Sequence, residues 1–406
     1  MGFFNLSNIT IFLLLIILKL NLSSGASGKI KKGSPSRLED NRNKVNFAGV
    51  SHVSASMQAT SLDGDGNDNL CFNHGTARSY QVYWNVPTFM CQQYGININD
   101  LNKFGICQNE NDKFLGEKIV ILYDPGRFPK LIQNDNGTMT RRNGGVPQEG
   151  NLQSHLDAFT TQVEEEVEEN FSGLAVIDFE SWRPIFRQNW AALLPYRYLS
   201  VRLERQRNPS GKTRSINRRV IQSFESAAKL FMEETIKLAK RLRPRAHWTY
   251  YGYPYCYNYT PGAPWASCEP QTLRENDRLS WLWELEDVIS PSMYLRYPLS
   301  TDQRIGLVAG RLHEAVRIKT AFPNRPIIPV FWFKFIDKPD IYLTREDVRS
   351  SFDTMIKNGA DSHMIWASYL DVNSRDKCLE VKKYINDILG PAVEEVKQAY
   401  HLMGHV

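Results

Sequence analysis

Residues 173–184 read Gly-Leu-Ala-Val-Ile-Asp-Phe-Glu-Ser-Trp-Arg-Pro, an apolar run followed by two carboxylates that a single residue separates. The run from Leu174 to Ile177 predicts a buried strand. Because side chains alternate along a strand, Asp178 and Glu180 should point to the same side at its carboxyl end. Two crowded carboxyl groups do not both ionise freely, so one is expected to keep a proton and act as a general acid. This arrangement favours cleavage of a glycosidic bond.

The residues that follow the two carboxylates strengthen this interpretation. Alone, Asp-x-Glu after an apolar run is more often a solvated strand end than a catalytic pair. Residues 181–190 add two tryptophans and two arginines, namely Trp182, Arg183, Arg187 and Trp190. Indole rings suit the stacking of sugars, and guanidinium groups bind carboxylates.

Five further segments occur in the same order as in one known family. They read YWNVPTFMC at residues 83–91, ILYDP at 121–125, NGGVPQ at 143–148, YGYPYCYN at 251–258 and PSMYLR at 291–296. With residues 173–190 they make the chain resemble the hyaluronidases, in particular the venom and salivary hyaluronidases of arthropods. The resemblance covers nearly all of residues 79–399, and several long motifs in a fixed order are more specific than one short pattern.

Short strand-like runs alternate with longer helical ones along this part of the chain. The expected strands are residues 81–86, 118–123, 174–179, 247–253, 288–294, 327–333 and 363–367. An apolar stripe within 220–242 predicts one of the intervening helices. This alternation predicts parallel strands with helices outside them. An open doubly wound sheet fits equally well, but it often has a Gly-rich loop after its first strand, which is missing here, so a closed barrel is favoured. The resemblance implies a distorted TIM-type (β/α) barrel of about seven strands, with a single catalytic domain.

The resemblance also implies how the two carboxylates act. Glu180 would donate a proton to the leaving glycosidic oxygen and later activate water as a base. The nucleophile would be the substrate's own acetamido carbonyl, oriented by Asp178. Such substrate assistance retains the configuration of the anomeric carbon.

Five other residues are implied to bind the substrate. Tyr251 and Tyr294 would hold the acetamido group, and Trp366 would wall the pocket against its methyl. Arg183 and Tyr123 are expected to contact the polymer. Without a resemblance, aromatic residues at strand ends would more often be packing residues.

The expected protein is therefore a secreted endo-β-N-acetylhexosaminidase that hydrolyses the β-1,4 bonds of hyaluronan, with chondroitin as a side substrate and without a cofactor. Two alternatives stay open. One is a catalytically weak, glycan-binding protein of the same fold. The other is a hydrolase of another amino sugar polymer, such as chitin, which lacks the uronate that Arg183 would engage.

Composition agrees with this expectation. Of the 406 residues, 42% are hydrophobic and 12% aromatic, which describes a globular protein. The net charge of +5 mildly favours an acidic partner such as hyaluronan, which has a carboxylate on every second sugar. The sequence lacks the block of Lys, Arg and aromatic residues of a nucleic-acid groove. A calcium-loop pattern that starts at Asp63 and a zincin-like pattern that starts at His313 both lack required ligands, so no metal site is expected.

Four regions are expected along the chain. Residues 1–25 resemble a secretory signal peptide with an apolar core at 11–18, although no Lys or Arg precedes the core. Residues 26–78 are polar and predict a flexible extension. The barrel domain would occupy 79–400, and 401–406 would form a tail. An uncleaved anchor is the alternative, but Lys19 interrupts the apolar run, so we expect secretion without membrane attachment.

The six cysteines suit an oxidising compartment. The resemblance implies two disulfides, Cys91 with Cys378 and Cys256 with Cys268. Cys71 and Cys107 could bond to each other or remain free. Glycosylation sequons occur at Asn136, Asn170 and Asn258.

Overall fold

The computed structural model describes residues 80–259 and 265–402. These residues belong to one compact unit, Cys71–Val406. The expected signal peptide, the whole of the expected polar extension with Cys71, and residues 403–406 of the expected tail lie outside the described residues. Within the described ranges, no helix is both long enough and apolar enough to cross a bilayer.

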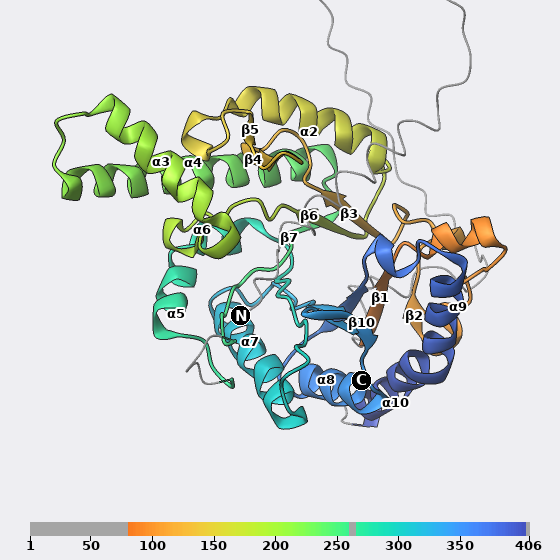
Figure 1. Cartoon of the computed structure of the whole chain (residues 1–406). Helices are drawn as coiled ribbons and strands as arrows, with labels where there is room; N and C mark the ends of the chain where they lie inside the picture. The colour runs from red at the N-terminus through yellow and green to blue at the C-terminus, as the bar shows by residue number, and fades with distance from the viewer. Residues whose placement is uncertain (1–79, 260–264, 403–406) are drawn as a thin grey trace, which may run out of the picture. The chain divides into compact units, whose positions relative to one another are not determined.

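Two parallel sheets form the centre of the fold (Figure 1). One has the strand order β2-β1-β11-β8 and the other β3-β6-β7, and all paired neighbours run parallel. The strand bounds are Gln81–Asn85 (β1), Ile106–Cys107 (β2), Ile119–Tyr123 (β3), Leu174–Asp178 (β6), His247–Tyr250 (β7), Val330–Trp332 (β8) and Ser362–Trp366 (β11).

The expected strand at 288–294 joins the two sheets, although it forms only isolated bridges. Ile289 bridges to Ile327 and Ser292 to Val330, both in parallel orientation. On its other side, the backbone N–H of Asp287 donates to the carbonyl of Trp248 in β7 at 2.8 Å. The segment contains a proline at position 291, which has no N–H to give to a ladder. Six of the seven expected strands are therefore present, and the seventh segment contributes isolated bridges to the distorted TIM-type barrel.

Helices lie outside the strands, as expected (Figure 1). Their bounds are Leu152–Glu166 (α2), Leu194–Arg207 (α3), Thr213–Leu242 (α4), Pro270–Asp277 (α5), Ser280–Leu285 (α6), Thr301–Ala321 (α7), Arg345–Lys357 (α8), Arg375–Tyr384 (α9) and Gly390–Leu402 (α10). The expected apolar stripe of α4 is buried, including Val220, Phe224, Ala228 and Phe231. Short 3-10 helices occupy Thr88–Tyr94 (η1), Leu101–Phe104, Glu110–Asp112, Pro147–Glu149, Phe186–Gln188, Ala191–Leu193 and Tyr369–Asp371, and a π-helix occupies Ile385–Leu389.

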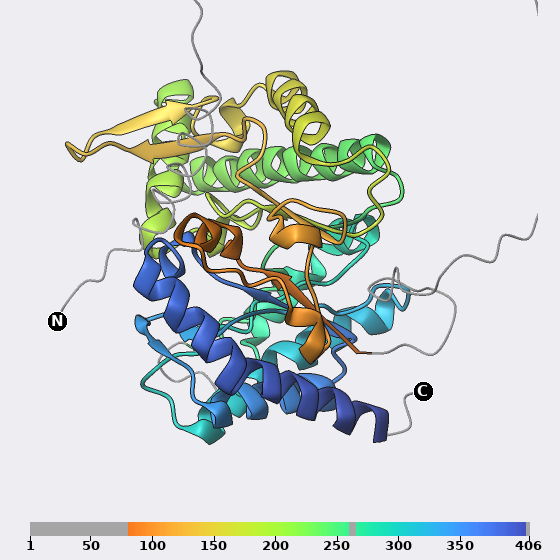
Figure 2. The same ribbon diagram turned by 90° about the vertical axis from the view of Figure 1, so that its right-hand side faces the viewer.

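Two antiparallel hairpins decorate the barrel. One pairs β4 (Lys130–Gln133) with β5 (Met139–Arg142), and the other pairs β9 (Lys334–Phe335) with β10 (Lys338–Tyr342). Figure 2 shows the tip of the β4 and β5 hairpin, in yellow, extending beyond the neighbouring helices.

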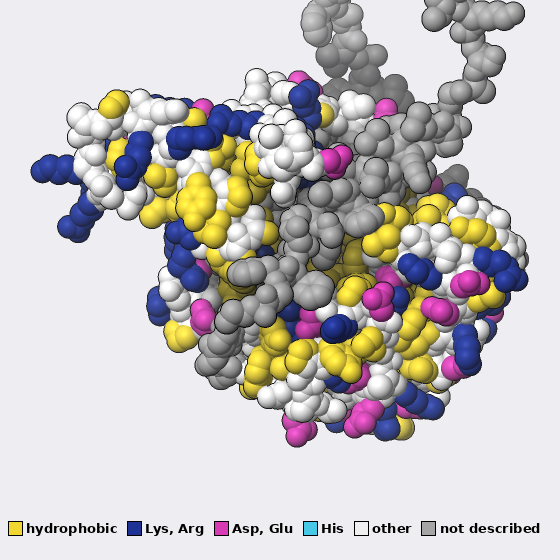
Figure 3. Space-filling view, in the orientation of Figure 1, with side chains coloured by type: hydrophobic (Ala, Val, Ile, Leu, Met, Phe, Trp, Pro, Cys, Tyr) yellow, Lys and Arg dark blue, Asp and Glu magenta, His cyan; other side chains and the backbone are white. Residues whose placement is uncertain are grey.

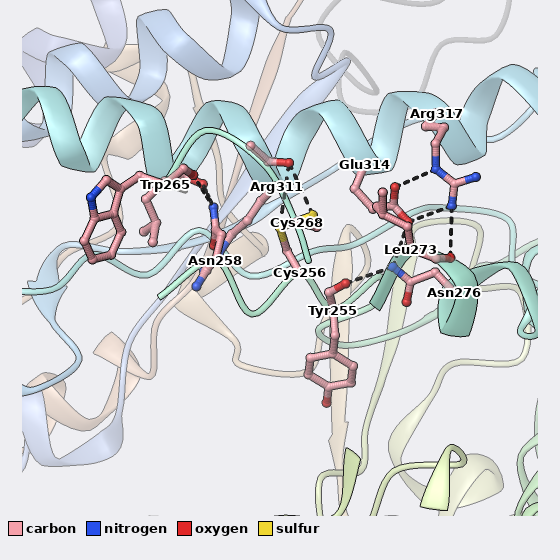
Figure 4. The surroundings of a disulfide bond; sticks show 12 residues. Tyr255, Cys256, Asn258, Trp265, Cys268, Leu273, Asn276, Arg311, Glu314 and Arg317 are labelled. Atoms are coloured by element: carbon pink, nitrogen blue, oxygen red, sulfur yellow. Dashed lines mark hydrogen bonds and ion pairs between the residues drawn. A yellow bond between two sulfur atoms is a disulfide. The ribbon is translucent and has the colours of Figure 1, made fainter. Parts of the chain in front are cut away.

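The two disulfides implied by the resemblance are both present. Cys91 is bonded to Cys378, which ties η1 to α9 across 287 residues of sequence. Cys256 is bonded to Cys268, which closes the loop before α5 (Figure 4). Cys107 is disulfide-bonded as well, so it is not free, and its partner lies outside the described residues.

The structure contradicts the expected glycan on Asn258. Its side chain is fully buried, and its amide nitrogen donates to the carbonyls of Trp265 at 2.7 Å and Leu307 at 2.9 Å (Figure 4). Its amide oxygen accepts from the Nε of Arg311 at 3.2 Å. A glycan is attached to this same nitrogen and needs open surface, and a sequon does not encode burial. The asparagines of the other two sequons, Asn136 and Asn170, are exposed, and glycans on them stay predictions.

Candidate active site

The carboxylate pair lies where β6 ends. β6 is buried between β3 and β7, so its ladders are satisfied on both sides and its carboxyl end is held in place. Asp178 is the last residue of the strand and pairs in register with Tyr123. Asp178 is only 8% exposed, whereas Glu180, two residues farther, is exposed. The site therefore has one carboxyl group inside the protein and one that solvent or substrate can reach.

Both carboxyl groups have raised pKa values. Burial raises the pKa of Asp178 well above its ordinary value, and the negative charges of Glu180 and Asp124 raise it further, against the opposing charge of Lys130. Displacement of water by the surrounding protein atoms also raises the pKa of Glu180, while the cation of Arg183 lowers it. The pair therefore keeps a proton at a higher pH than two isolated carboxyl groups would.

Three of the aromatic residues expected in the site meet beside this pair. The ring centroids of Tyr251 and Tyr294 are 6.2 Å apart, and those of Tyr294 and Trp366 are 5.8 Å apart and nearly stacked. Burial raises the pKa of both tyrosines well above 10, and the charge of Glu180 adds to this effect. Their hydroxyl groups therefore remain protonated and can donate hydrogen bonds.

Tyr123 joins this group from the end of β3. Its hydroxyl accepts a hydrogen bond from the indole Nε1 of Trp366, with 2.6 Å between the two atoms. Its ring stacks on Phe114 with centroids 6.0 Å apart. Burial raises the pKa of this tyrosine, and the charge of Asp178 raises it further. The tyrosine is thus held at the edge of the site by both ends of its side chain.

Arg183 lies in the site but its cation is already engaged. The guanidinium carbon is 4.6 Å from the ring centroid of Tyr255 and 5.6 Å from that of Tyr257. Its Nη1 donates to the carbonyl of Gln188 at 2.9 Å. Its electrostatic effect reaches Glu180, so the arginine tunes the exposed carboxyl group, and its expected contact with the polymer stays a prediction.

Sequence reasoning missed a tryptophan that belongs to the aromatic wall. The ring of Trp332, the last residue of β8, lies 5.9 Å from that of Tyr294 and 5.6 Å from that of Trp366. Its Nε1 donates to a carboxylate oxygen of Asp371 at 3.1 Å, and Lys334 binds the other oxygen at 2.7 Å. Because this residue lies next to the last position of the expected strand at 327–333, the strand-end rule that selected the other aromatics could have found it.

A second missed group lies next to the buried carboxyl. Asp124 accepts two hydrogen bonds of 2.8 Å from Arg142 and one of 3.0 Å from Lys130. The aspartate has a positive φ of 45°, an uncommon backbone conformation. The negative charge of Asp124 raises the pKa of Asp178, and the positive charge of Lys130 lowers it. Only the fold brings the β4 and β5 hairpin to this position, so spacing along the sequence gives no signal for it.

The titrating groups of the site are carboxyls and phenols. The buried histidines His155 and His363 have their pKa lowered to about 3 by burial, so they stay neutral at physiological pH. In the two described ranges, no group of three or more His, Cys, Asp or Glu residues is arranged to hold a metal ion. The arrangement at hand can donate a proton, accept one and bind an amide group.

Comparison with known proteins relates this chain to one family of enzymes. A family model described as hyaluronidase matches residues 73–406. Hyaluronidase of Apis mellifera is 48% identical over 328 residues, which are 80% of this chain and 86% of that protein. Hyaluronidase B of Vespa velutina is 45% identical over 324 residues, or 79% of this chain and 98% of that protein. The crystal structure of bee venom hyaluronidase in complex with a hyaluronic acid tetramer matches with a TM-score of 0.77 and 48% identity, over 78% of this chain and 99% of that one.

Proposed function

Because the chain belongs to the hyaluronidase family, we propose that it is an endo-β-N-acetylhexosaminidase that hydrolyses the β-1,4 bonds of hyaluronan, with chondroitin as a side substrate. The observation that carries this proposal is the meeting of Asp178 and Glu180 with the hydroxyls of Tyr251 and Tyr294 at the carboxyl ends of the strands. Carboxyl groups with raised pKa values beside protonated phenols suit acid and base catalysis on a sugar that carries an amide.

Glu180 is the proposed general acid. It is exposed, so the glycosidic oxygen of a polymer can reach it, and its raised pKa favours the protonated form before the bond breaks. As the bond breaks, its proton passes to the leaving oxygen. The resulting carboxylate then removes a proton from water, which attacks the anomeric carbon.

Asp178 is the proposed partner of the substrate's acetamido group. Its carboxyl group is buried, so it is well placed to hold the amide N–H while the amide oxygen attacks the anomeric carbon. The positive charge that forms on the cyclic intermediate is stabilised when this carboxyl group is ionised. Two inversions at the same carbon give net retention, so NMR of the first products should show the β anomer. An α anomer at early times would contradict this mechanism.

The aromatic residues provide the proposed pocket for the acetamido group. The hydroxyls of Tyr251 and Tyr294 would donate to its oxygen, and Trp366 would cover its methyl. Chondroitin carries the same kind of N-acetylated sugar between uronates, so it should also fit. Zymography on hyaluronan, chondroitin and chitin tests the proposal. Clearing of hyaluronan is expected, clearing of chitin alone would contradict the substrate, and no clearing would favour a binding protein.

We also propose that the protein is secreted. Two disulfides within the described residues, Cys91 with Cys378 and Cys256 with Cys268, support an oxidising compartment. The signal-peptide prediction for residues 1–25 points the same way. Expression in insect cells should place the protein in the medium, and retention of all activity inside the cells would contradict secretion.

A further inference from the structure

The positive charge of the chain is concentrated in one helical hairpin. Residues 194–219, called the basic arm here, comprise α3, the connecting loop and the first turns of α4. They carry eight Lys and Arg side chains and a single carboxylate, Glu204, for a net charge of +7, compared with +5 for the whole chain. Figure 3 shows Lys and Arg side chains gathered at the left-hand end of this face, over α3 and α4.

Most of these cations are free to meet a ligand. The exposed basic residues of the arm that make no ion pair with any described residue are Arg202, Arg205, Lys212, Arg214 and Arg218. Acidic neighbours engage only two of the others, Arg207 through Glu149 at 2.5 Å and Arg219 through Glu204 at 4.0 Å. A cluster of like charges that the protein does not neutralise repels itself, so an anionic ligand would be stabilised there.

The topology places the basic arm on the side of the active site. The hydroxyl of Tyr250, the last residue of β7, donates to the carbonyl of Met232 in α4 at 2.9 Å. The last residues of α4 lead into the start of β7, so the helix and the strand run in opposite directions. Residues 213–231 of α4 therefore lie past the carboxyl end of β7, over a length of roughly 28 Å at 1.5 Å per residue. Asp178 ends the neighbouring strand on the same side. Figure 1 shows the hairpin extending from the rest of the described chain.

Exposed aromatic rings lie next to the site and on the arm. Trp190 is 43% exposed and packs edge-on against Tyr257, which lies on the guanidinium of Arg183. Tyr198 is 67% exposed on α3. Its side chain shares one face of the helix with Arg202, four residues on. Rings that alternate with cations suit a chain of sugars that carries regularly spaced carboxylates.

We propose that the basic arm is a second binding surface for the hyaluronan chain, which holds a part of the polymer that lies beyond the active site. This inference rests on the hyaluronan hydrolysis proposed above. The arm would raise the local concentration of long chains near Glu180, while short oligosaccharides that fill only the active site would not reach it. An anionic polysaccharide fits this surface because the cations are spread along two helices, with the exposed ring of Tyr198 among them and that of Trp190 near Arg183.

The test uses the full chain with Arg202, Arg214 and Arg218 all changed to Gln. KM for long hyaluronan should rise at least about threefold and lose part of its dependence on salt, with kcat unchanged, because three exposed attractions are removed. KM for a short hyaluronan oligosaccharide should not change. The same three positions changed to Lys keep the charge and should keep most of the affinity. Arg241→Gln, at the other end of α4, is the control for the loss of an exposed arginine.

Binding measured without catalysis separates this inference from the proposed function. In the Glu180→Gln background, the three Gln substitutions should weaken binding of long hyaluronan in the same proportion. An unchanged affinity, or an equal loss for the short oligosaccharide, would overturn the arm as a separate surface. Arm-dependent binding to vesicles of anionic phospholipid without any to hyaluronan would overturn it as well. If the parent protein cleaves no hyaluronan but still binds it through the arm, the proposed hydrolysis is wrong, whereas the proposed binding surface on the arm is supported.

Discussion

The indole Nε1 of Trp366 donates a 2.6 Å hydrogen bond to the hydroxyl of Tyr123 and so links the ends of two strands that belong to different sheets. Trp366 ends β11, and Tyr123 ends β3. The bond fixes the plane of the indole, which stacks on Tyr294. A single polar contact thereby connects the wall of the proposed acetamido pocket to the strand beside Asp178.

Tyr123→Phe tests this link. The ring is kept and only the hydroxyl is lost, so Trp366 loses the partner that orients it. We expect kcat/KM for hyaluronan to fall by about 3- to 10-fold, the effect of one ordinary hydrogen bond, with little change in melting temperature. Tyr342→Phe is the matched control, because the Tyr342 hydroxyl is buried without a hydrogen-bond partner in the described structure. Equal effects of the two substitutions would contradict a specific role for the link.

Asp178→Asn tests the electrostatics of the buried carboxyl. Its pKa is raised in the folded state, so the folded protein binds the proton more tightly than the unfolded chain. Stability is therefore lost as pH rises from the ordinary carboxyl range through the raised pKa, by about 1.4 kcal/mol for each unit of the shift. Asn does not ionise, so the variant should gain melting temperature relative to the parent at pH 7 but not at pH 3, while turnover falls.

Asp340→Asn removes an exposed aspartate of β10 and is the control for this measurement. It should change stability little at either pH. A stability difference between Asp178→Asn and the parent that is the same at both pH values would contradict the raised pKa.

Local patterns were sufficient for the main features of the barrel. Apolar runs bounded by turn residues gave the strands, and the run before Asp178 became a central, fully buried strand because both of its faces are covered. The alternation of strands and amphipathic helices then led to parallel sheets. The expected strand at 288–294 is irregular, because Pro291 has no N–H for the ladder.

Details of the site depend on contacts between distant segments, and local patterns did not contain them. β6 ends at Asp178, so Glu180 lies past the hydrogen-bonded part of the sheet. Glu180 is therefore exposed while Asp178 is buried, although the alternation of side chains along a strand predicted the same side for both. Arg183 is covered by tyrosines from a loop more than 70 residues away. Asn258 fits a sequon but serves as a hydrogen-bonding centre inside the fold.

Peptide mapping of the protein from insect cells tests the burial of Asn258. Glycans are expected on peptides that contain Asn136 or Asn170, both of which are exposed. The peptide with Asn258 should carry none. Asn258→Ala should destabilise the fold by about 1–3 kcal/mol, because it removes the buried donor to the carbonyls of Trp265 and Leu307 and the acceptor for Arg311. A glycan on Asn258 in active protein would contradict the described packing.

The central claim, that Glu180 is the acid and base of a hyaluronan hydrolase, is tested most directly by the turnover of Glu180→Gln. The amide keeps the size of the side chain but has no titrating proton. Turnover should fall at least about 100-fold while hyaluronan oligomers still bind, whereas Glu169→Gln, an exposed change between α2 and β6, should retain full activity. A Glu180→Gln enzyme that turns over hyaluronan at the rate of the parent would contradict the account.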